Sequence, residues 1–286
     1  MKKQLKAELY LLIATILLGL GLPISSIALR TVPSFTFISL RYFVAAGVLG
    51  IIFYKSFKKM NKKLFKFALL IGTLMAFSLG LQTVGLLYTS PEISGFIMGL
   101  TVVFVPILVA ILYKKAPDFR TIIGIILSLI GLVIMCGDFG NGINIGEFLT
   151  LTGSIITAFQ IILLDRFGME HDAVLLTTIE FFVAGFWSLI PTVTTQSFPT
   201  TFNLVALLCV LFVAVIGTAI PMVVMNKMQP YTNPTHASII YLAEPISSAV
   251  FSALLGYPIA FNTIVGCVLI VLGTLVISIK FTKKKS

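Results

Sequence analysis

The chain has 286 residues, of which 58% are hydrophobic and only 10% are charged, with a mean hydropathy of +1.09 and a formal net charge of +10. Soluble domains of ordinary composition carry about 25% charged residues, so this chain has too few to cover a water-facing surface. The composition therefore excludes an ordinary soluble domain and predicts an integral membrane protein.

Apolar stretches of about 20 residues recur along the chain, which is the length that an α-helix needs to cross about 30 Å of hydrocarbon. A transmembrane β-barrel would instead show roughly ten-residue segments of alternating polarity, and stretches such as Thr121–Met135 do not alternate. The first apolar stretch follows three lysines but has no signal-peptide cleavage pattern, so we interpret it as a retained helix. We predict an all-α protein with ten transmembrane helices. They span residues 8–29, 35–54, 66–88, 93–113, 120–137, 146–164, 173–193, 203–226, 235–255 and 262–280.

The basic residues concentrate on one side of this predicted topology. If both termini are cytoplasmic, every basic residue except Arg30 and Arg41 falls on the cytoplasmic side. These residues are Lys2, Lys3, Lys6, Lys55, Lys58, Lys59, Lys62, Lys63, Lys66, Lys114, Lys115, Arg120, Arg166, Lys227, Lys280, Lys283, Lys284 and Lys285. This is the positive-inside pattern of a multi-pass protein of the plasma membrane, and it explains the net charge without a nucleic-acid partner.

The two halves of the chain resemble each other. The sequence FRTIIG at Phe119–Gly124 matches FNTIVG at Phe261–Gly266, and YTSP at Tyr88–Pro91 matches YTNP at Tyr231–Pro234. The matches keep the same order at a spacing of about 140 residues, which indicates an internal duplication.

The duplication predicts two domains, residues 1–140 and 141–286, with five helices each. Because five is odd, the second set of helices enters the membrane from the opposite side, so the repeats are inverted. Inverted repeats are typical of transporters, in which two related bundles rock around a site near the membrane midplane.

Three ionisable residues lie deep inside predicted helices, well away from the helix ends: Arg41, Glu180 and Glu244. Such a residue costs about 2.5–3.5 kcal/mol at the bilayer centre and marks a functional site by default. Glu244 falls near the midplane, and the proline ring of Pro245 is expected to free the carbonyl of Tyr241 beside the carboxylate. We predict that Glu244 binds a proton or a cationic group in a cavity. The alternative is a packing kink, with the carboxylate held by a hydroxyl or an amide of another helix.

Arg41 and Glu180 occupy equivalent positions in the two repeats, and we expect them to form a structural ion pair rather than a substrate contact. Gln82, Gln160 and Tyr241 also lie inside predicted helices. They are candidates to line the same cavity, although such residues often serve only to hold membrane helices together.

Pro106 is the counterpart of Pro245 in the first half. The two prolines differ by about one helical turn in their distance from Thr89 and Thr232, so they keep roughly the same facing, and Pro106 is a candidate gating residue. His236 falls at the start of the ninth helix, where we expect it to be solvated.

The second half contains the pattern T-x-P-x-x-A-x-x-x-x-L-x-E-P within YTNPTHASIIYLAEPISSAV (Tyr231–Val250). This pattern resembles the EamA type of the drug/metabolite transporter superfamily, and SGFIMGLTVVFVP (Ser94–Pro106) resembles the first-half counterpart. The resemblance covers essentially the whole chain. It implies ten helices and proton- or gradient-driven movement of small metabolites, usually outward, with cargo that ranges from amino acids to nucleobases, sugars and drugs.

The sequence contains no nucleotide-binding loop, hydrolase or metalloprotease signature, and Cys136, Cys209 and Cys267 stand singly, so neither a cofactor nor a metal site is predicted. We predict a non-enzymatic secondary active transporter that exports a small metabolite, an amino acid or a drug-like molecule, with protons as the coupling ion and lipid around it. Two alternatives stay open: an intramembrane lipid-modifying enzyme that uses Glu244 as general base, and a passive channel.

Overall fold

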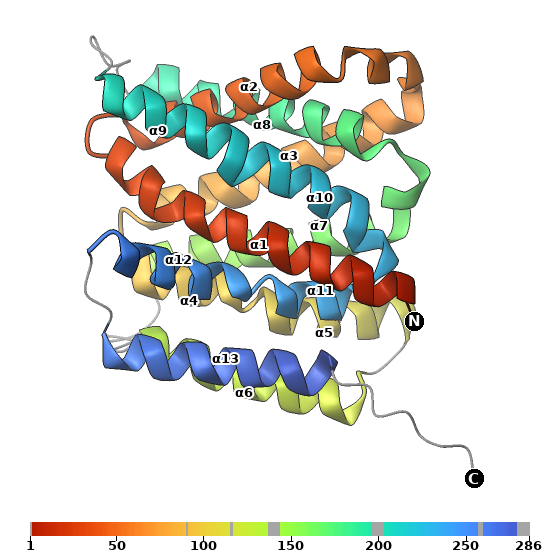
Figure 1. The fold of residues 1–286 in the computed structure, drawn as a ribbon, viewed down its shortest axis with the longest axis vertical. Helices are drawn as coiled ribbons and strands as arrows, with labels where there is room; N and C mark the ends of the chain where they lie inside the picture. The colour runs from red at the N-terminus through yellow and green to blue at the C-terminus, as the bar shows by residue number, and fades with distance from the viewer. Residues whose placement is uncertain are drawn as a thin grey trace.

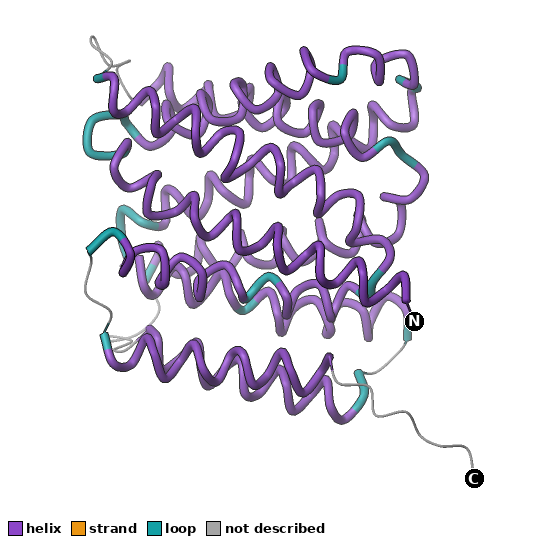
Figure 2. Tube along the Cα trace, viewed as in Figure 1, coloured by secondary structure: helices purple, strands orange, loops and turns teal. Residues whose placement is uncertain are grey.

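The computed structural model describes residues 2–89, 91–114, 117–136, 144–195, 203–256 and 260–278, and these residues form helices and short connections without any strand (Figure 2). The predicted domain boundary between residues 140 and 141 lies outside the described residues, as do Lys115 and the C-terminal lysines. The α-helices are α1 (Lys2–Ala28), α2 (Ser34–Ile52), α3 (Lys62–Gly85), α4 (Pro91–Gly99), α5 (Thr101–Tyr113), α6 (Phe119–Cys136), α7 (Ile145–Phe167), α8 (Ala173–Thr195), α9 (Leu204–Ala214), α10 (Ile220–Met228), α11 (Pro234–Ile240), α12 (Ala243–Leu254) and α13 (Phe261–Ser278).

These helices form the ten predicted membrane crossings. Three of the crossings are interrupted: α4 and α5 form the fourth, α9 and α10 form the eighth around the π-helical turn η3 (Val215–Ala219), and α11 and α12 form the ninth. Eight crossings are long and apolar enough to span a membrane, and two shorter apolar helices, Phe119–Ile134 and Phe261–Val276, complete the set. The prediction of an all-α membrane protein with ten helices is confirmed.

Asparagine side chains fix the starts of several crossings. Asn61, Asn144, Asn203 and Asn233 each accept a hydrogen bond from a backbone N–H two or three residues further on. Such caps satisfy donors that the first helical turn leaves free. They therefore place the helix starts where the apolar stretches begin.

The helices run roughly along one direction, with the pair α6 and α13 at one edge and α2 and α8 at the other (Figure 1). The start of α1 and the end of α13 lie at the same end of the bundle, which we call the α1-start end. The connections η1 (Tyr54–Lys59), η2 (Gly168–Glu170) and η4 (Gln229–Tyr231) lie at this end too. An even number of crossings produces this arrangement.

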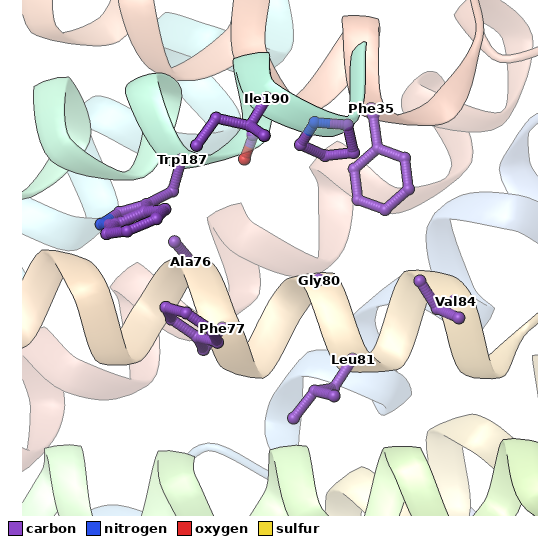
Figure 3. A pocket seen from close by; sticks show the side chains of 10 residues that line it. Phe35, Ala76, Phe77, Gly80, Leu81, Val84, Trp187 and Ile190 are labelled. Atoms are coloured by element: carbon purple, nitrogen blue, oxygen red, sulfur yellow. The ribbon is translucent and has the colours of Figure 1, made fainter. Parts of the chain in front are cut away.

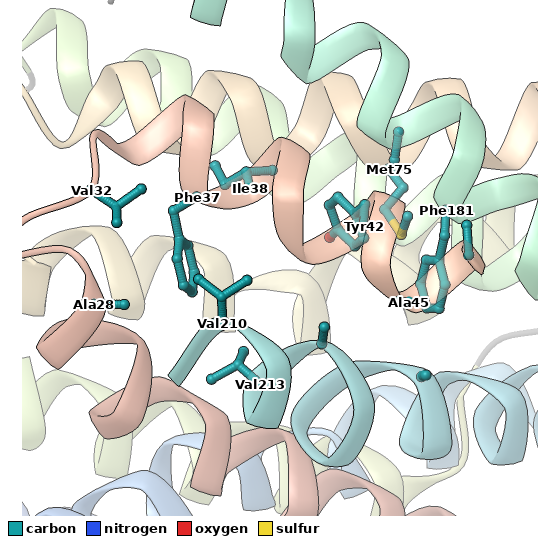
Figure 4. Close-up of a cluster of buried hydrophobic side chains, with 14 of the residues drawn as sticks. Ala28, Val32, Phe37, Ile38, Tyr42, Ala45, Met75, Phe181, Val210 and Val213 are labelled. Atoms are coloured by element: carbon teal, nitrogen blue, oxygen red, sulfur yellow. The ribbon is translucent and has the colours of Figure 1, made fainter. Parts of the chain in front are cut away.

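The largest buried hydrophobic cluster joins α1, α2, α8 and α9 (Figure 4). Phe37, Phe181 and Val213 are almost completely buried within it. Ser39 crosses the interface between α2 and α8, because its hydroxyl donates to the carbonyl of Gly185 at 3.1 Å. The cluster fixes the second and seventh crossings against each other.

Two interfaces show the twofold relation of the repeats directly. At the α6–α13 interface, Gly131 packs against the carbonyl of Gly266, and Gly273 packs against the carbonyl of Gly124. Gly131 and Gly273 are equivalent in the two repeats, and so are Gly124 and Gly266. The two contacts are therefore the same contact made twice, as expected when equivalent helices face each other across a twofold axis.

The α2–α8 interface repeats this pattern with aromatic rings. Tyr42 stacks on Phe181 with ring centroids 5.4 Å apart, and Phe43 meets Phe182 edge-on at 5.8 Å. Each of these pairs has the same sequence separation, so equivalent residues touch across the axis.

Candidate functional site

Glu244 lies in the first turn of α12, directly after a break in the ninth crossing. The break falls at Tyr241 and Leu242, between the end of α11 and the start of α12. Pro245 removes a helical donor, as predicted, but the Tyr241 carbonyl is not left free, because it accepts a hydrogen bond from the Glu244 N–H at 3.1 Å. The expectation of a freed carbonyl beside the carboxylate is therefore wrong, since a tighter turn replaces the missing bond.

Glu244 is a partly buried residue, and its carboxylate has no hydrogen-bond partner among the described residues. Arg41, on α2, lies close enough to attract it electrostatically. Tyr42 is buried, and both Arg41 and Glu244 lie close enough to influence its hydroxyl electrostatically. The free acceptor capacity of this carboxylate lets it take up a proton or a positively charged group, while the nearby cation favours its ionised form.

The first crossing lies directly against this turn. A side chain at Gly19 would come within 2.6 Å of the Glu244 carbonyl and would collide with Ser247. Ser247 donates its hydroxyl to the same carbonyl at 3.0 Å. Only glycine permits this approach, so a movement of α1 changes the surroundings of Glu244 at once.

Arg41 is held by the π-helical turn of the eighth crossing. Its Nε donates to the Thr218 hydroxyl at 2.5 Å, and its Nη2 donates to the Gly217 carbonyl at 3.4 Å. Pro221, four residues after Gly217, cannot supply the helical donor for that carbonyl. The arginine therefore donates to a carbonyl whose usual helical donor is replaced by a proline, and π-helical turns are frequent at functional sites.

Glu180 does not pair with Arg41. It is 0% exposed within α8, and its Oε2 accepts a hydrogen bond from the Asn226 side chain at 2.6 Å. Its Oε1 has no partner among the described residues. The predicted ion pair is therefore wrong: the two residues are equivalent in sequence, but each turns to a different part of the eighth crossing.

Tyr241 is anchored rather than free to bind a ligand. Its hydroxyl donates to Gln229 at 2.6 Å, and the amide of Gln229 donates to the Ile161 carbonyl on α7 at 2.7 Å. Gln160 is the neighbour of Ile161, so it lies beside this chain of hydrogen bonds. Gln82 lies elsewhere, because the end of α3 packs against the start of α7. Neither glutamine side chain makes a hydrogen bond within the described part of the chain.

Pro106 lies inside α5 and does not cause the break in the fourth crossing. That break falls at Leu100, between α4 and α5, and it is anchored by the Thr101 hydroxyl, which lies 3.0 Å from the Ser154 hydroxyl on α7. The fourth and ninth crossings thus break at equivalent places although their prolines are offset.

Two apolar cavities lie away from Glu244. One of about 340 Å³ is formed by α2, α3 and α8, and Phe77 and Trp187 are among the residues that line it (Figure 3). The other, of about 260 Å³, lies beside Pro106. Neither is lined by an ionisable residue, so the polar centre is a separate feature built by the broken helices.

The sequence interpretation missed three residues that position the ionisable groups: Thr218, Asn226 and Gln229. All three are polar residues within or directly after the apolar run of the eighth crossing, and Asn226 and Gln229 are almost completely buried. The signal in the sequence that could have identified them was the presence of polar side chains in an otherwise apolar run. Which ionisable residue each one contacts follows only from the packing.

Comparison with known proteins identifies the family. The profile of the EamA-like transporter family matches residues 5–137 and 144–279, one repeat each. An uncharacterized transporter of Archaeoglobus fulgidus is 28% identical over 97% of this chain and 87% of its own length. The uncharacterized transporter YyaM of Bacillus subtilis is 28% identical over 68% of this chain and 67% of its own length.

The crystal structure of another protein superposes with a TM-score of 0.78 at 17% identity, over 95% of this chain and 97% of that one. It shows that the fold is shared. Two inverted five-helix repeats, a polar centre at broken helices and a family match in both halves lead to one conclusion: the chain belongs to the EamA-like transporter family of the drug/metabolite transporter superfamily.

Proposed function

We propose that this chain is a secondary active transporter that exports a small metabolite, an amino acid or a drug-like molecule, by alternating access. Glu244 binds the coupling proton or the cationic part of the cargo, and Arg41 provides the opposite charge. The observation that carries this proposal is the Glu244 carboxylate, which has no hydrogen-bond partner among the described residues, lies beside a helix break and is under the electrostatic influence of Arg41.

The remaining polar residues have supporting roles in this proposal. Tyr241 forms the wall next to Glu244, held by Gln229, and Gln160 lies on the adjoining part of α7. Gln82 contacts cargo nearer the start of α7. Pro245 and Pro106 set the bends about which the ninth and fourth crossings move, and Glu180 keeps the seventh and eighth crossings together through Asn226.

The repeats extend over residues 1–140 and 141–286, and the α1-start end faces the cytoplasm of a cell whose plasma membrane holds the protein. The partners are the cargo, protons and the lipid that surrounds the exposed apolar side chains; nucleic acid is not a partner. The basic residues support this orientation, because the described lysines and arginines other than Arg30 and Arg41 belong to segments at the α1-start end.

Flux in proteoliposomes tests the proposal. A growth-protection screen against toxic amino acids and drugs first finds a cargo, and counterflow then separates a transporter from a channel, which does not saturate, and from an enzyme, which changes its substrate. Glu244→Gln should retain counterflow but lose the dependence of flux on an imposed pH gradient. Glu170→Gln is the control, because that carboxylate is half-exposed and only 3.6 Å from Lys63. An unchanged pH dependence in Glu244→Gln would remove Glu244 as the coupling site.

A further inference from the structure

A carboxylate joins the first crossing to the ninth at the α1-start end. The Oε1 atom of Glu8 accepts hydrogen bonds from Gln4 at 2.8 Å and from the Thr232 hydroxyl at 3.0 Å, and it lies 3.2 Å from Nδ1 of His236. The side chains of Glu8 and His236 are only 15% and 18% exposed. The histidine that the sequence predicted to be solvated is thus part of a partly buried contact between α1 and the start of α11.

A second carboxylate makes the corresponding contact at the opposite end. Glu147, in the first turn of α7, is 8% exposed. Its Oε1 accepts from the Asn144 side chain at 3.0 Å and from the Thr89 hydroxyl at 3.5 Å. Thr89 lies two residues before the start of α4, so this contact joins the sixth crossing to the segment that leads into the fourth.

The two contacts are copies of each other. Glu8 and Glu147 have the same sequence separation as Tyr42 and Phe181, which stack across the twofold axis. Their hydroxyl partners, Thr232 and Thr89, are the threonines of the matching YTNP and YTSP segments. Because the repeats are inverted, equivalent contacts lie at opposite ends of the bundle.

We propose that these contacts are a pair of latches, one for each end of the transport pathway. The Glu8 latch holds α1 against α11 and closes the α1-start end, and the Glu147 latch holds α7 against the start of α4 and closes the other end. Each carboxylate keeps its cross-helix partner only while its end is closed. The proposal rests on alternating access, in which one end opens while the other stays shut.

Tightly packed residues lie directly behind each latch. Leu11, three residues after Glu8, is 0% exposed in a cluster with Ala237 and Ile240 of α11. Thr150, three residues after Glu147, is 0% exposed and packs against Gly85 of α3. Leu11 and Thr150 are also equivalent in the two repeats. Opening one end therefore exposes one of these residues and leaves the other buried.

The two latches differ in strength. Glu8 has two partners across the helix interface, Thr232 and His236, whereas the cross-helix partner of Glu147 among the described residues is Thr89. The Thr232 hydroxyl also lies nearer to its carboxylate than the Thr89 hydroxyl does, at 3.0 Å compared with 3.5 Å. The Glu8 latch is therefore the firmer one, and the resting protein opens more readily at the end that Glu147 closes.

Cysteine labelling tests the latches without any cargo. In a background with the native cysteines replaced by alanine, Leu11→Cys and Thr150→Cys each report on one end through the rate of reaction with a small water-soluble maleimide. Thr232→Val and Thr89→Val form a matched pair, because each removes only the hydroxyl that crosses between helices. Glu8→Gln and Glu147→Gln form a second pair, and the glutamine at position 147 still completes the capping box of α7.

Thr232→Val should raise the labelling of the cysteine at position 11 about tenfold, as expected for a lost hydrogen bond to a charged group, and lower that at position 150. Thr89→Val should do the reverse with a smaller change. Thr152→Val is the control, since its hydroxyl contacts only its own helix. If both reporters rise together, or neither changes, the contacts are ordinary structural bonds and the latch proposal is wrong. Because no flux is measured, this result is independent of the assignment of Glu244.

Discussion

At the scale of single residues, prolines decide which carbonyls receive side-chain partners. Pro245 leaves the Tyr241 carbonyl without its helical donor, and a backbone N–H one turn away takes its place. Pro221 likewise cannot donate to the Gly217 carbonyl, and the guanidinium of Arg41 donates to that carbonyl instead. In the second case the carbonyl left by the proline holds a charged residue inside a predicted membrane crossing, where an unpaired polar group is costly.

The hydroxyl of Thr218 is predicted to orient Arg41 for transport. Thr218→Val keeps the size of the side chain but removes the acceptor for Nε, whereas Thr218→Ser keeps the acceptor. Flux in proteoliposomes should fall about tenfold in the valine variant, because a hydrogen bond to a charged group is worth about 1.5–3 kcal/mol, and it should stay near the parent value in the serine variant. Equal flux in the two variants would show that the contact does not position the arginine.

Asp172, outside the membrane-spanning segments, provides a pH-dependent contribution to stability. Burial raises the pKa of its carboxyl, but hydrogen bonds from Lys59 at 2.7 Å and from the Leu175 N–H lower it by more, so the pKa lies below its ordinary value. A lowered pKa contributes stability above the unfolded-state value, and that contribution is lost as the pH falls through the folded-state value. The difference in melting temperature between the parent and Asp172→Asn should shrink from about pH 6 to about pH 3. A constant difference would contradict this.

At the scale of elements, glycines set how closely the helices of the two repeats approach. The pair α6 and α13 packs backbone to backbone, because Gly131 and Gly273 each face a carbonyl of the other helix. Small residues at such crossings are the common way in which membrane helices gain packing without a hydrophobic driving force. A glycine also allows close packing at the break of the ninth crossing, since Gly19 lets α1 approach the backbone at Glu244.

A methyl group at Gly131 is predicted to separate α6 from α13. In Gly131→Ala the new carbon would lie 2.6 Å from the Gly266 carbonyl oxygen, closer than unbonded atoms approach. Overpacking of this kind costs about 1–3 kcal/mol, so the melting temperature of the purified protein in detergent should fall. Gly47→Ala is the matched control, because the space around Gly47 is open, and its melting temperature should stay the same or rise, since alanine favours the helix.

At the scale of the whole molecule, the inverted repeat makes the two ends of the bundle chemically different. Lysine-rich connections gather at the α1-start end, whereas the latch at the opposite end contains Glu147 and Asn144. In the latch proposal, the site at Glu244 is exposed to one side of the membrane or the other, depending on whether the Glu8 contact or the Glu147 contact is broken.

The proposed orientation predicts the side from which each end can be labelled. In the background without native cysteines, Lys58→Cys in η1 should react with a membrane-impermeant maleimide only from the cytoplasmic face. Tyr88→Cys, at an exposed position just after α3, should react only from outside. Labelling of intact cells and of inverted vesicles measures both, and reactivity from the same side would contradict the crossing that α3 makes between these two positions.

The sequence alone determined the membrane class, the ten crossings, their duplication and the candidate charges, because each of these depends on composition or on local spacing along the chain. Apolar length defines a crossing, and an odd number of crossings per repeat inverts the second copy. Pro245 and Pro106 lie in crossings that are in fact interrupted. The break in the fourth crossing falls at Leu100, however, and not at Pro106.

Only the tertiary structure decided which polar groups meet. Arg41 and Glu180 looked like natural partners by charge and symmetry, yet Arg41 reaches Thr218 and Glu180 reaches Asn226. The latches likewise join residues far apart in the chain, Glu8 to Thr232 and Glu147 to Thr89. The reason is that a hydrogen bond requires two atoms to come within about 3 Å, and that proximity is set by the way the helices pack.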